Sequence, residues 1–114
     1  MARFTSIALA MASAIGYAFA SSGDMTYYAP GLGACGIVNN ESDAVVALSY
    51  LQYSGADPCG RTIDITLNGK TVSATVVDKC MGCVEDAIDV SPSVFELLAS
   101  LDVGRTVVEW DFTS

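Results

Sequence analysis

The sequence predicts a small all-β domain of the barrel type, cross-linked by two disulfide bonds. Three observations indicate this fold: a strong β-hairpin signal near residue 68, several other short β-prone stretches beside one helical stretch, and four cysteines in a chain of 114 residues. Short strands with little helix in about 94 residues are typical of a small barrel. We expect one domain over residues 21–114, with one or two short helices.

The predicted hairpin is the clearest local signal. Apolar residues alternate with polar ones over residues 62–67 and again over residues 71–76, on the two sides of Asn68-Gly69. This alternation predicts strands with one buried face, and Asn-Gly favours the positive φ angles of a two-residue type I′ turn. We therefore predict two antiparallel strands joined at this turn.

One helix is predicted after residue 90. Ser91 suits the N-cap, and Pro92 suits the first helical position, where its missing N–H is no loss. Apolar residues follow at the spacing of one helix face, before Gly104. That predicted face consists of Val94, Leu97, Leu98 and Leu101.

Three other stretches are β-prone or ambiguous. Residues 106–112 alternate and predict a last strand with Trp110 in the core. Residues 44–51 form an apolar run that fits either a buried strand or a short helix, and its periodicity does not decide between them. Tyr27 and Tyr28 lie in a short β-prone stretch that ends at Pro30.

The first twenty residues have the features of a secretory signal peptide. Arg3 provides a positive charge, residues 7–14 are largely apolar and uncharged, and Ala18-Phe19-Ala20 is a small-x-small cleavage pattern. The alternative is a membrane anchor over residues 4–20, which would be short beside the usual span of about 20 apolar residues. We expect cleavage after Ala20 and a secreted, extracellular protein that no longer associates with the membrane.

The remaining chain holds all four cysteines, which are Cys35, Cys59, Cys80 and Cys83. Their even number in an exported chain predicts two disulfides, for which three connectivities exist. A bond within the last pair would constrain little. Bonds from the first two to that pair would close loops of about 20–50 residues, each stabilising the fold by about 3–4 kcal/mol in the chain-entropy model. We favour the second arrangement.

Metal and redox roles for the cysteines are less well supported. A four-cysteine zinc site usually needs two close pairs, and only one exists. A thioredoxin-like pair needs a βαβ context, and no helical pattern directly follows Cys83. We expect neither a metal nor a cofactor.

The predicted domain is strongly acidic. It holds four of the five basic residues and all thirteen acidic ones, a net charge of −9. Such a surface repels nucleic acid and anionic lipid, and it suits a neutral or cationic partner. The sequence has no histidine, which excludes every Ser-His and Cys-His nucleophile arrangement.

A series of short motifs spans nearly all of this domain. They are Thr26-Tyr27-Tyr28, Gly33-Ala34-Cys35-Gly36, Cys59-Gly60-Arg61-Thr62-Ile63, Val76-Val77-Asp78-Lys79-Cys80-Met81-Gly82-Cys83, Ile88-Asp89-Val90-Ser91-Pro92 and Val108-Glu109-Trp110. Their order and spacing resemble the fungal expansin-like proteins called loosenins, and more broadly the barwin, expansin and rare-lipoprotein-A group. This resemblance implies a six-stranded double-psi β-barrel with a polysaccharide groove across one face.

The resemblance also implies which residues line that groove. Single-domain expansin relatives place there a Thr from the first strand and two Asp eleven positions apart, which correspond to Thr26, Asp78 and Asp89. Tyr28 is predicted to bind substrate with them. Carboxylates and a hydroxyl suit a sugar because they exchange hydrogen bonds with its hydroxyls. Taken alone, Asp78 also fits a turn cap, and Asp89 a favourable charge near a helix N-terminus.

Hydrolysis is not expected, and no catalytic residue is assigned. A glycosidase needs two carboxylates across the scissile bond. In related hydrolases the general acid stands at the position of Asp89, and the base stands where this sequence has Pro30, which cannot exchange a proton. An unrelated pair of Asp78 and Asp89 acting as a weak glycosidase is the lesser alternative. A groove tyrosine of some bacterial expansins is replaced by Cys80.

The sequence thus predicts a monomeric, non-hydrolytic protein that binds cell-wall glucan or chitin and loosens the contacts between chains. The competing hypothesis is a protein-binding module, either an inhibitor of a papain-like cysteine protease or an effector. That role would use exposed loops at residues 31–35 or 81–86.

Overall fold

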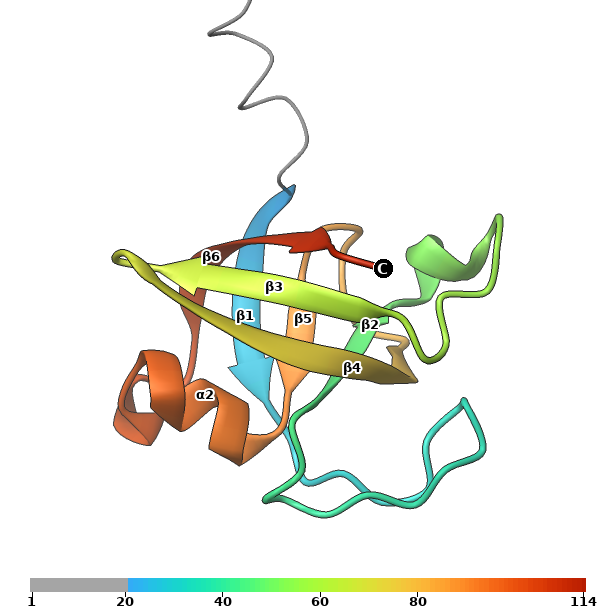
Figure 1. Ribbon diagram of the computed structural model, residues 1–114, viewed down its shortest axis with the longest axis horizontal. Helices are drawn as coiled ribbons and strands as arrows, with labels where there is room; N and C mark the ends of the chain where they lie inside the picture. Colours follow the sequence, from blue (N-terminus) through green and yellow to red (C-terminus); the bar gives the residue numbers. More distant parts are fainter. Residues whose placement is uncertain (1–20) are drawn as a thin grey trace, which may run out of the picture.

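Six strands form a closed barrel in the computed structural model, which describes residues 21–114; the predicted signal peptide lies outside the described residues. The strands follow one another around the barrel in the order β1-β5-β2-β4-β3-β6 (Figure 1). Their bounds are β1 Ser21–Tyr27, β2 Val45–Ser49, β3 Thr62–Leu67, β4 Lys70–Cys80, β5 Ile88–Val90 and β6 Thr106–Phe112. Two neighbouring pairs, β1 with β5 and β2 with β4, are parallel, and the other four are antiparallel. The prediction of a six-stranded barrel is confirmed.

The predicted hairpin joins β3 to β4. Leu67 pairs with Lys70, so the loop contains only Asn68 and Gly69. Both have positive φ, 51° and 82°, as a type I′ turn requires. The tightness of this turn fixes which faces of β3 and β4 point into the barrel.

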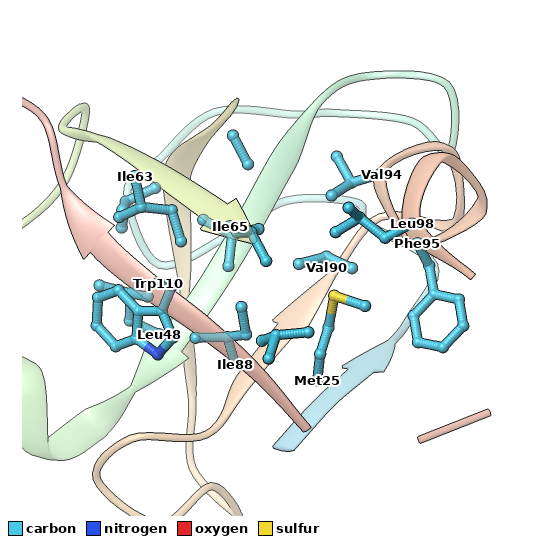
Figure 2. Packing of buried hydrophobic residues seen from close by; sticks show 14 residues of the cluster. Met25, Leu48, Ile63, Ile65, Ile88, Val90, Val94, Phe95, Leu98 and Trp110 are labelled. Carbon is cyan, nitrogen blue, oxygen red and sulfur yellow. The ribbon is translucent and has the colours of Figure 1, made fainter. Parts of the chain in front are cut away.

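The barrel interior is filled by side chains, as Figure 2 shows for the cluster that includes Met25, Ile65 and Trp110. Trp110 lies in this core, as predicted, and its indole N–H donates to the Asp86 carbonyl at 2.9 Å. The ambiguous run at residues 44–51 is strand β2, followed by the 3₁₀ helix η1 (Tyr50–Tyr53). Strand β2 is buried throughout because β4 and β5 flank it and other residues cover its outer face.

The predicted helix is shorter than expected, and its buried face differs. Helix α2 (Pro92–Leu98) ends at Ala99, which is extended, and a separate 3₁₀ helix, η2 (Leu101–Val103), precedes Gly104. The buried face is Val94, Phe95 and Leu98, whereas Leu97 is 58% exposed. The assignment of Leu97 to the core face was wrong because Phe95, rather than Leu97, packs against the barrel beside Val94 and Leu98.

The N-cap is also only partly as predicted. Ser91 stands at the N-cap position and its carbonyl accepts from Val94 and Phe95, but its side chain makes no capping bond. The buried hydroxyl lies instead beside the Val45 amide and the Ser93 hydroxyl. No acidic residue occupies the first turn of the helix.

The favoured disulfide pairing is wrong. The bonds are Cys35–Cys59 and Cys80–Cys83, with Cα–Cα distances of 5.7 and 5.4 Å. The backbone explains the first bond, because the Cys35 and Gly60 amides donate to the consecutive carbonyls of Val77 and Val76 on β4. Two separate loops thereby meet on one strand.

Within residues 21–114 every cysteine is paired, and no cluster of three potential metal ligands occurs. The same residues contain no helix with the length and apolarity to cross a membrane.

Candidate functional site

A single row of residues crosses the outer face of four neighbouring strands. Thr26 on β1 pairs with Asp89 on β5, Asp89 pairs with Ala47 on β2, and Ala47 pairs with Asp78 on β4. Paired residues in a sheet project to the same face. The row faces outward, because the residues on either side of Asp89, Ile88 and Val90, belong to the barrel core.

A β-bulge brings Asp78 into this row. The register between β2 and β4 shifts after Val46, which pairs with Val76, so that Ala47 pairs with Asp78 and Val77 is the extra residue. Without the shift, Asp78 would pair with Leu48, whose side chain belongs to the core. The bulge therefore decides that this carboxylate faces outward.

Asp89 is half-buried and accepts a hydrogen bond from the Thr26 hydroxyl at 3.0 Å. Burial raises the pKa of its carboxyl, and the charge of Asp78 adds to this rise. The Thr26 hydrogen bond and the Arg105 charge oppose it. Since the folded-state pKa lies above the unfolded value, protonation of Asp89 stabilises the folded protein as the pH falls towards its ordinary pKa. A partly buried carboxyl group with a shifted pKa is typical of a functional site.

Tyr28 lies near both aspartates. It follows β1 two residues after Thr26, and its amide donates to the Val90 carbonyl at 3.0 Å. Burial, followed by the charges of Asp78 and Asp89, raises the pKa of its hydroxyl. The hydroxyl is therefore neutral at ordinary pH and available as a donor. All four predicted groove residues lie in one site.

The loop between β1 and β2 is drawn in cyan and green in Figure 1, and it is hydrogen-bonded to Asp78 on β4. The Asp78 Oδ1 atom accepts from the amides of Ala34 and Lys79, each at 2.8 Å. A Cβ atom at Gly33 would collide with the Val77 carbonyl oxygen, so this close approach requires glycine. Asp78 therefore has a structural role, because its carboxylate holds this distant loop as well as the amide of the next residue, and the same residue is part of the row.

A cavity of about 350 Å³ lies alongside the row, and Thr26 and Asp89 are part of its lining. Asp24 and Arg105 lie on one side and form an ion pair at 3.0 Å. The opposite side is formed by residues of the disulfide turn and of the chain after it, which are Cys80, Gly82, Cys83, Val84 and Ala87. Sequence reasoning missed Asp24, although its period-two spacing with Thr26 and Tyr28 on β1 was a usable signal. No motif marks Arg105.

Comparisons with known proteins show the family. No protein-family model matches the chain. The papain inhibitor of Streptomyces mobaraensis is 35% identical over 100 residues, which cover 80% of this chain and 70% of the inhibitor. The solved structure of a Streptomyces papain inhibitor superposes with a TM-score of 0.76 and 32% identity, over 83% of this chain and 94% of that one. The chain belongs to the expansin- and barwin-like double-psi β-barrel proteins.

Two other relatives show the breadth of these barrel proteins. Allergen Asp f 7 of Aspergillus fumigatus is 45% identical over 89 residues, 73% of this chain. The chain spans only 33% of the length of that allergen. A mutant expansin of Clavibacter michiganensis, solved in complex with cellohexaose, has a TM-score of 0.75 and 27% identity, over 83% of this chain and 50% of the expansin. Double-psi barrels of this kind thus include both a sugar-bound protein and a protease inhibitor.

Proposed function

We propose that this protein is a secreted, non-hydrolytic polysaccharide-binding protein of the loosenin type. It binds cell-wall glucan or chitin along the row formed by Thr26, Tyr28, Asp78 and Asp89, and thereby weakens the contacts between polysaccharide chains. The observation that carries the proposal is the register that aligns Thr26, Asp89 and Asp78 on one outer face. Tyr28 lies close enough to both carboxylates for their charges to raise its pKa, so it belongs to the same site.

The chemistry of the row supports a sugar ligand. Two carboxylates accept hydrogen bonds from hydroxyls, and such charge-assisted bonds are about twice as strong as neutral ones. The Tyr28 hydroxyl adds a donor, and its ring adds an apolar surface for sugar C–H groups. The similarity to an expansin crystallised with cellohexaose agrees with this ligand class.

A non-hydrolytic mode of action follows from the state of the carboxylates. The raised pKa of Asp89 suits a general acid, but hydrolysis also needs a base or nucleophile. One oxygen of the Asp78 carboxylate, Oδ1, already accepts from the Ala34 and Lys79 amides. Pro30, at the position of the base in related hydrolases, carries no carboxylate.

Export of the protein is part of the same proposal. Both disulfides of the described barrel suit an oxidising compartment, where such bonds form and persist. The signal-peptide features of residues 1–20 agree with this location.

Loss of the Asp89 carboxylate is expected to lower the affinity for cellohexaose or chitohexaose about 10- to 100-fold, because hydrogen bonds to a charged group contribute about 1.5–3 kcal/mol. Titration calorimetry on the Asp89→Ala variant measures this loss. Asp64→Asn is the matched control, because Asp64 lies on β3, outside the row and the cavity beside it. Equal affinity of wild type and Asp89→Ala would refute the proposal that sugar binds along the row. Release of reducing sugar by wild type would refute the non-hydrolytic mode of action.

A second candidate function is inhibition of a papain-like cysteine protease, and one observation favours it. The loop over residues 31–38 presents Leu32 and Val38 to solvent, each 74% exposed, and these two residues form a β-bridge. The turn between these two residues is held by the Cys35–Cys59 disulfide and by the Ala34 amide, which donates to Asp78. A rigid loop with exposed apolar side chains suits a protein cleft, since little conformational entropy is lost on binding.

The substitution pair Leu32→Asp and Val38→Asp is expected to reduce papain inhibition at least tenfold if the loop is the inhibitory surface. Burying two carboxylates in an apolar cleft is costly, while the exposed positions tolerate them in the free protein. An inhibition assay with papain measures the effect, and retention on polysaccharide is expected to be unchanged. Inhibition that survives the pair but is lost in Asp89→Ala would assign the activity to the groove instead.

A further inference from the structure

The cavity beyond Asp89 has two walls of opposite character. One wall is polar and holds the carboxylates of Asp24 and Asp89, the Thr26 hydroxyl and the Arg105 guanidinium. The other is largely apolar, and its members are the Cys80–Cys83 disulfide, Gly82, Val84 and Ala87. Val84 is 72% exposed and so lies at the rim. Hydrogen-bonding groups therefore face an apolar surface across one cavity.

The cavity lies beside the row, in the direction that β1 takes from Thr26 towards Asp24. Asp24, Thr26 and Tyr28 alternate with Met25 and Tyr27 on β1, and Met25 is fully buried. Because side chains alternate along a strand, Asp24, Thr26 and Tyr28 lie on the outer face. The rise per residue of a strand places the Cα atoms of successive members about 7 Å apart. A ligand that follows β1 outward from Tyr28 and Thr26 next reaches Asp24 and the cavity.

We propose that this cavity is a second sugar subsite, which holds one pyranose unit of the polysaccharide bound along the row. This inference rests on the proposed function and extends it to Asp24, Arg105 and the Cys80–Cys83 turn. A pyranose ring has two apolar faces formed by C–H groups, and its hydroxyls project from the edge of the ring. One face packs on the disulfide and Val84, while the hydroxyls meet Asp24, Asp89 and Arg105.

The charges and the volume of the cavity suit a neutral sugar unit. The guanidinium of Arg105 is already paired with Asp24, so no unpaired positive charge attracts an anion. The pair offers donors and acceptors side by side, which matches hydroxyls that both give and accept hydrogen bonds. A volume of about 350 Å³ lies at the lower end of the range of about 300–1,000 Å³ for small-ligand sites, as a single sugar unit requires.

The closed turn explains how the apolar wall is held. The disulfide joins residues three positions apart at the end of β4, and the Ser49 hydroxyl fixes the turn by donating to the Cys83 carbonyl at 3.0 Å. Ser49 is itself fully buried and pairs with Cys80. The wall is therefore anchored to the barrel on both strands, which suits a preformed site.

The test is titration of cellohexaose and chitohexaose into wild type and the double variant Asp24→Asn/Arg105→Gln. The double variant removes both charges together and leaves neither unpaired, and an exposed ion pair stabilises a fold by only about 0–1 kcal/mol. Its affinity is expected to fall about tenfold, through loss of hydrogen bonds to one sugar unit. Asp64→Asn/Lys70→Gln is the matched control, because it also removes one charge of each sign but lies on the β3–β4 hairpin. The control is expected to bind as wild type does.

Amide chemical shifts provide a second readout that does not depend on the variants. The wild-type amides of Cys83, Val84 and Arg105 are expected to shift on titration with the hexasaccharide. If these amides do not shift and the double variant binds as tightly as wild type, the subsite proposal is overturned. The proposed function still holds in that case, provided that Asp89→Ala weakens binding. If wild type binds neither hexasaccharide, the proposed function itself fails and the subsite with it.

Discussion

Removal of the Cys35–Cys59 disulfide is expected to destabilise the protein by about 3.5 kcal/mol, whereas removal of the Cys80–Cys83 bond is expected to cost only about 2 kcal/mol. In the chain-entropy model the cost grows with the length of the closed loop. The two bonds join residues separated by 24 and 3 positions, respectively. Small domains are stable by only about 5–15 kcal/mol, so the larger loss is a substantial fraction of the whole.

Urea denaturation of the paired variants Cys35→Ala/Cys59→Ala and Cys80→Ala/Cys83→Ala measures both losses. The first pair is also expected to release the loop over residues 31–38 and to impair any activity that depends on it. The second pair is expected to retain the fold and to lose sugar affinity, because its turn forms the apolar wall of the cavity. Equal losses of stability in the two variants would contradict the loop-length argument.

Replacing Phe95 with alanine is expected to cost about 3–5 kcal/mol, the usual range for a buried aromatic residue. The side chain is fully buried in the barrel core, and its ring lies 4.9 Å from that of Tyr27, between centroids. Figure 2 shows it beneath helix α2, near Leu98 and Met25. The substitution leaves a cavity between the helix and the end of β1.

Leu97→Ala is the matched control, because it lies in the same helix but is largely exposed. Its cost is expected to stay below about 1 kcal/mol, as for most surface positions. Thermal or urea unfolding of both variants measures the difference. Similar losses for the two would mean that the helix buries the face predicted from its spacing rather than the face seen in the structure.

The sequence predicted those features that local chemistry or motif order determines. Asn68-Gly69 favours one kind of turn wherever it stands between alternating strands, and Trp110 lies in a clear alternation. The resemblance brought Thr26, Tyr28, Asp78 and Asp89 together because order and spacing of motifs reflect a shared barrel. These predictions did not require knowledge of how distant loops pack.

The features that sequence reasoning missed depend on contacts between distant segments. The disulfide pairing follows from two loops that hydrogen-bond to consecutive carbonyls of β4. The number and spacing of the cysteines carry no information about these hydrogen bonds. The outward direction of Asp78 follows from the bulge at Val77. The helix was expected to be too long because the apolar spacing continues past Ala99, where the chain becomes extended. Its face was misassigned because that spacing did not show that Phe95, rather than Leu97, packs against the barrel.

The complete ring of strands restricts how this protein engages any partner. Because β1 pairs with β6, every described strand has a neighbouring strand on both sides, and no described strand has a whole edge left open. The described barrel therefore lacks the full-length edge strand that recognition by β-augmentation uses. We therefore expect a glycan or polypeptide partner of the barrel to be bound by outward-facing side chains and by the connecting loops.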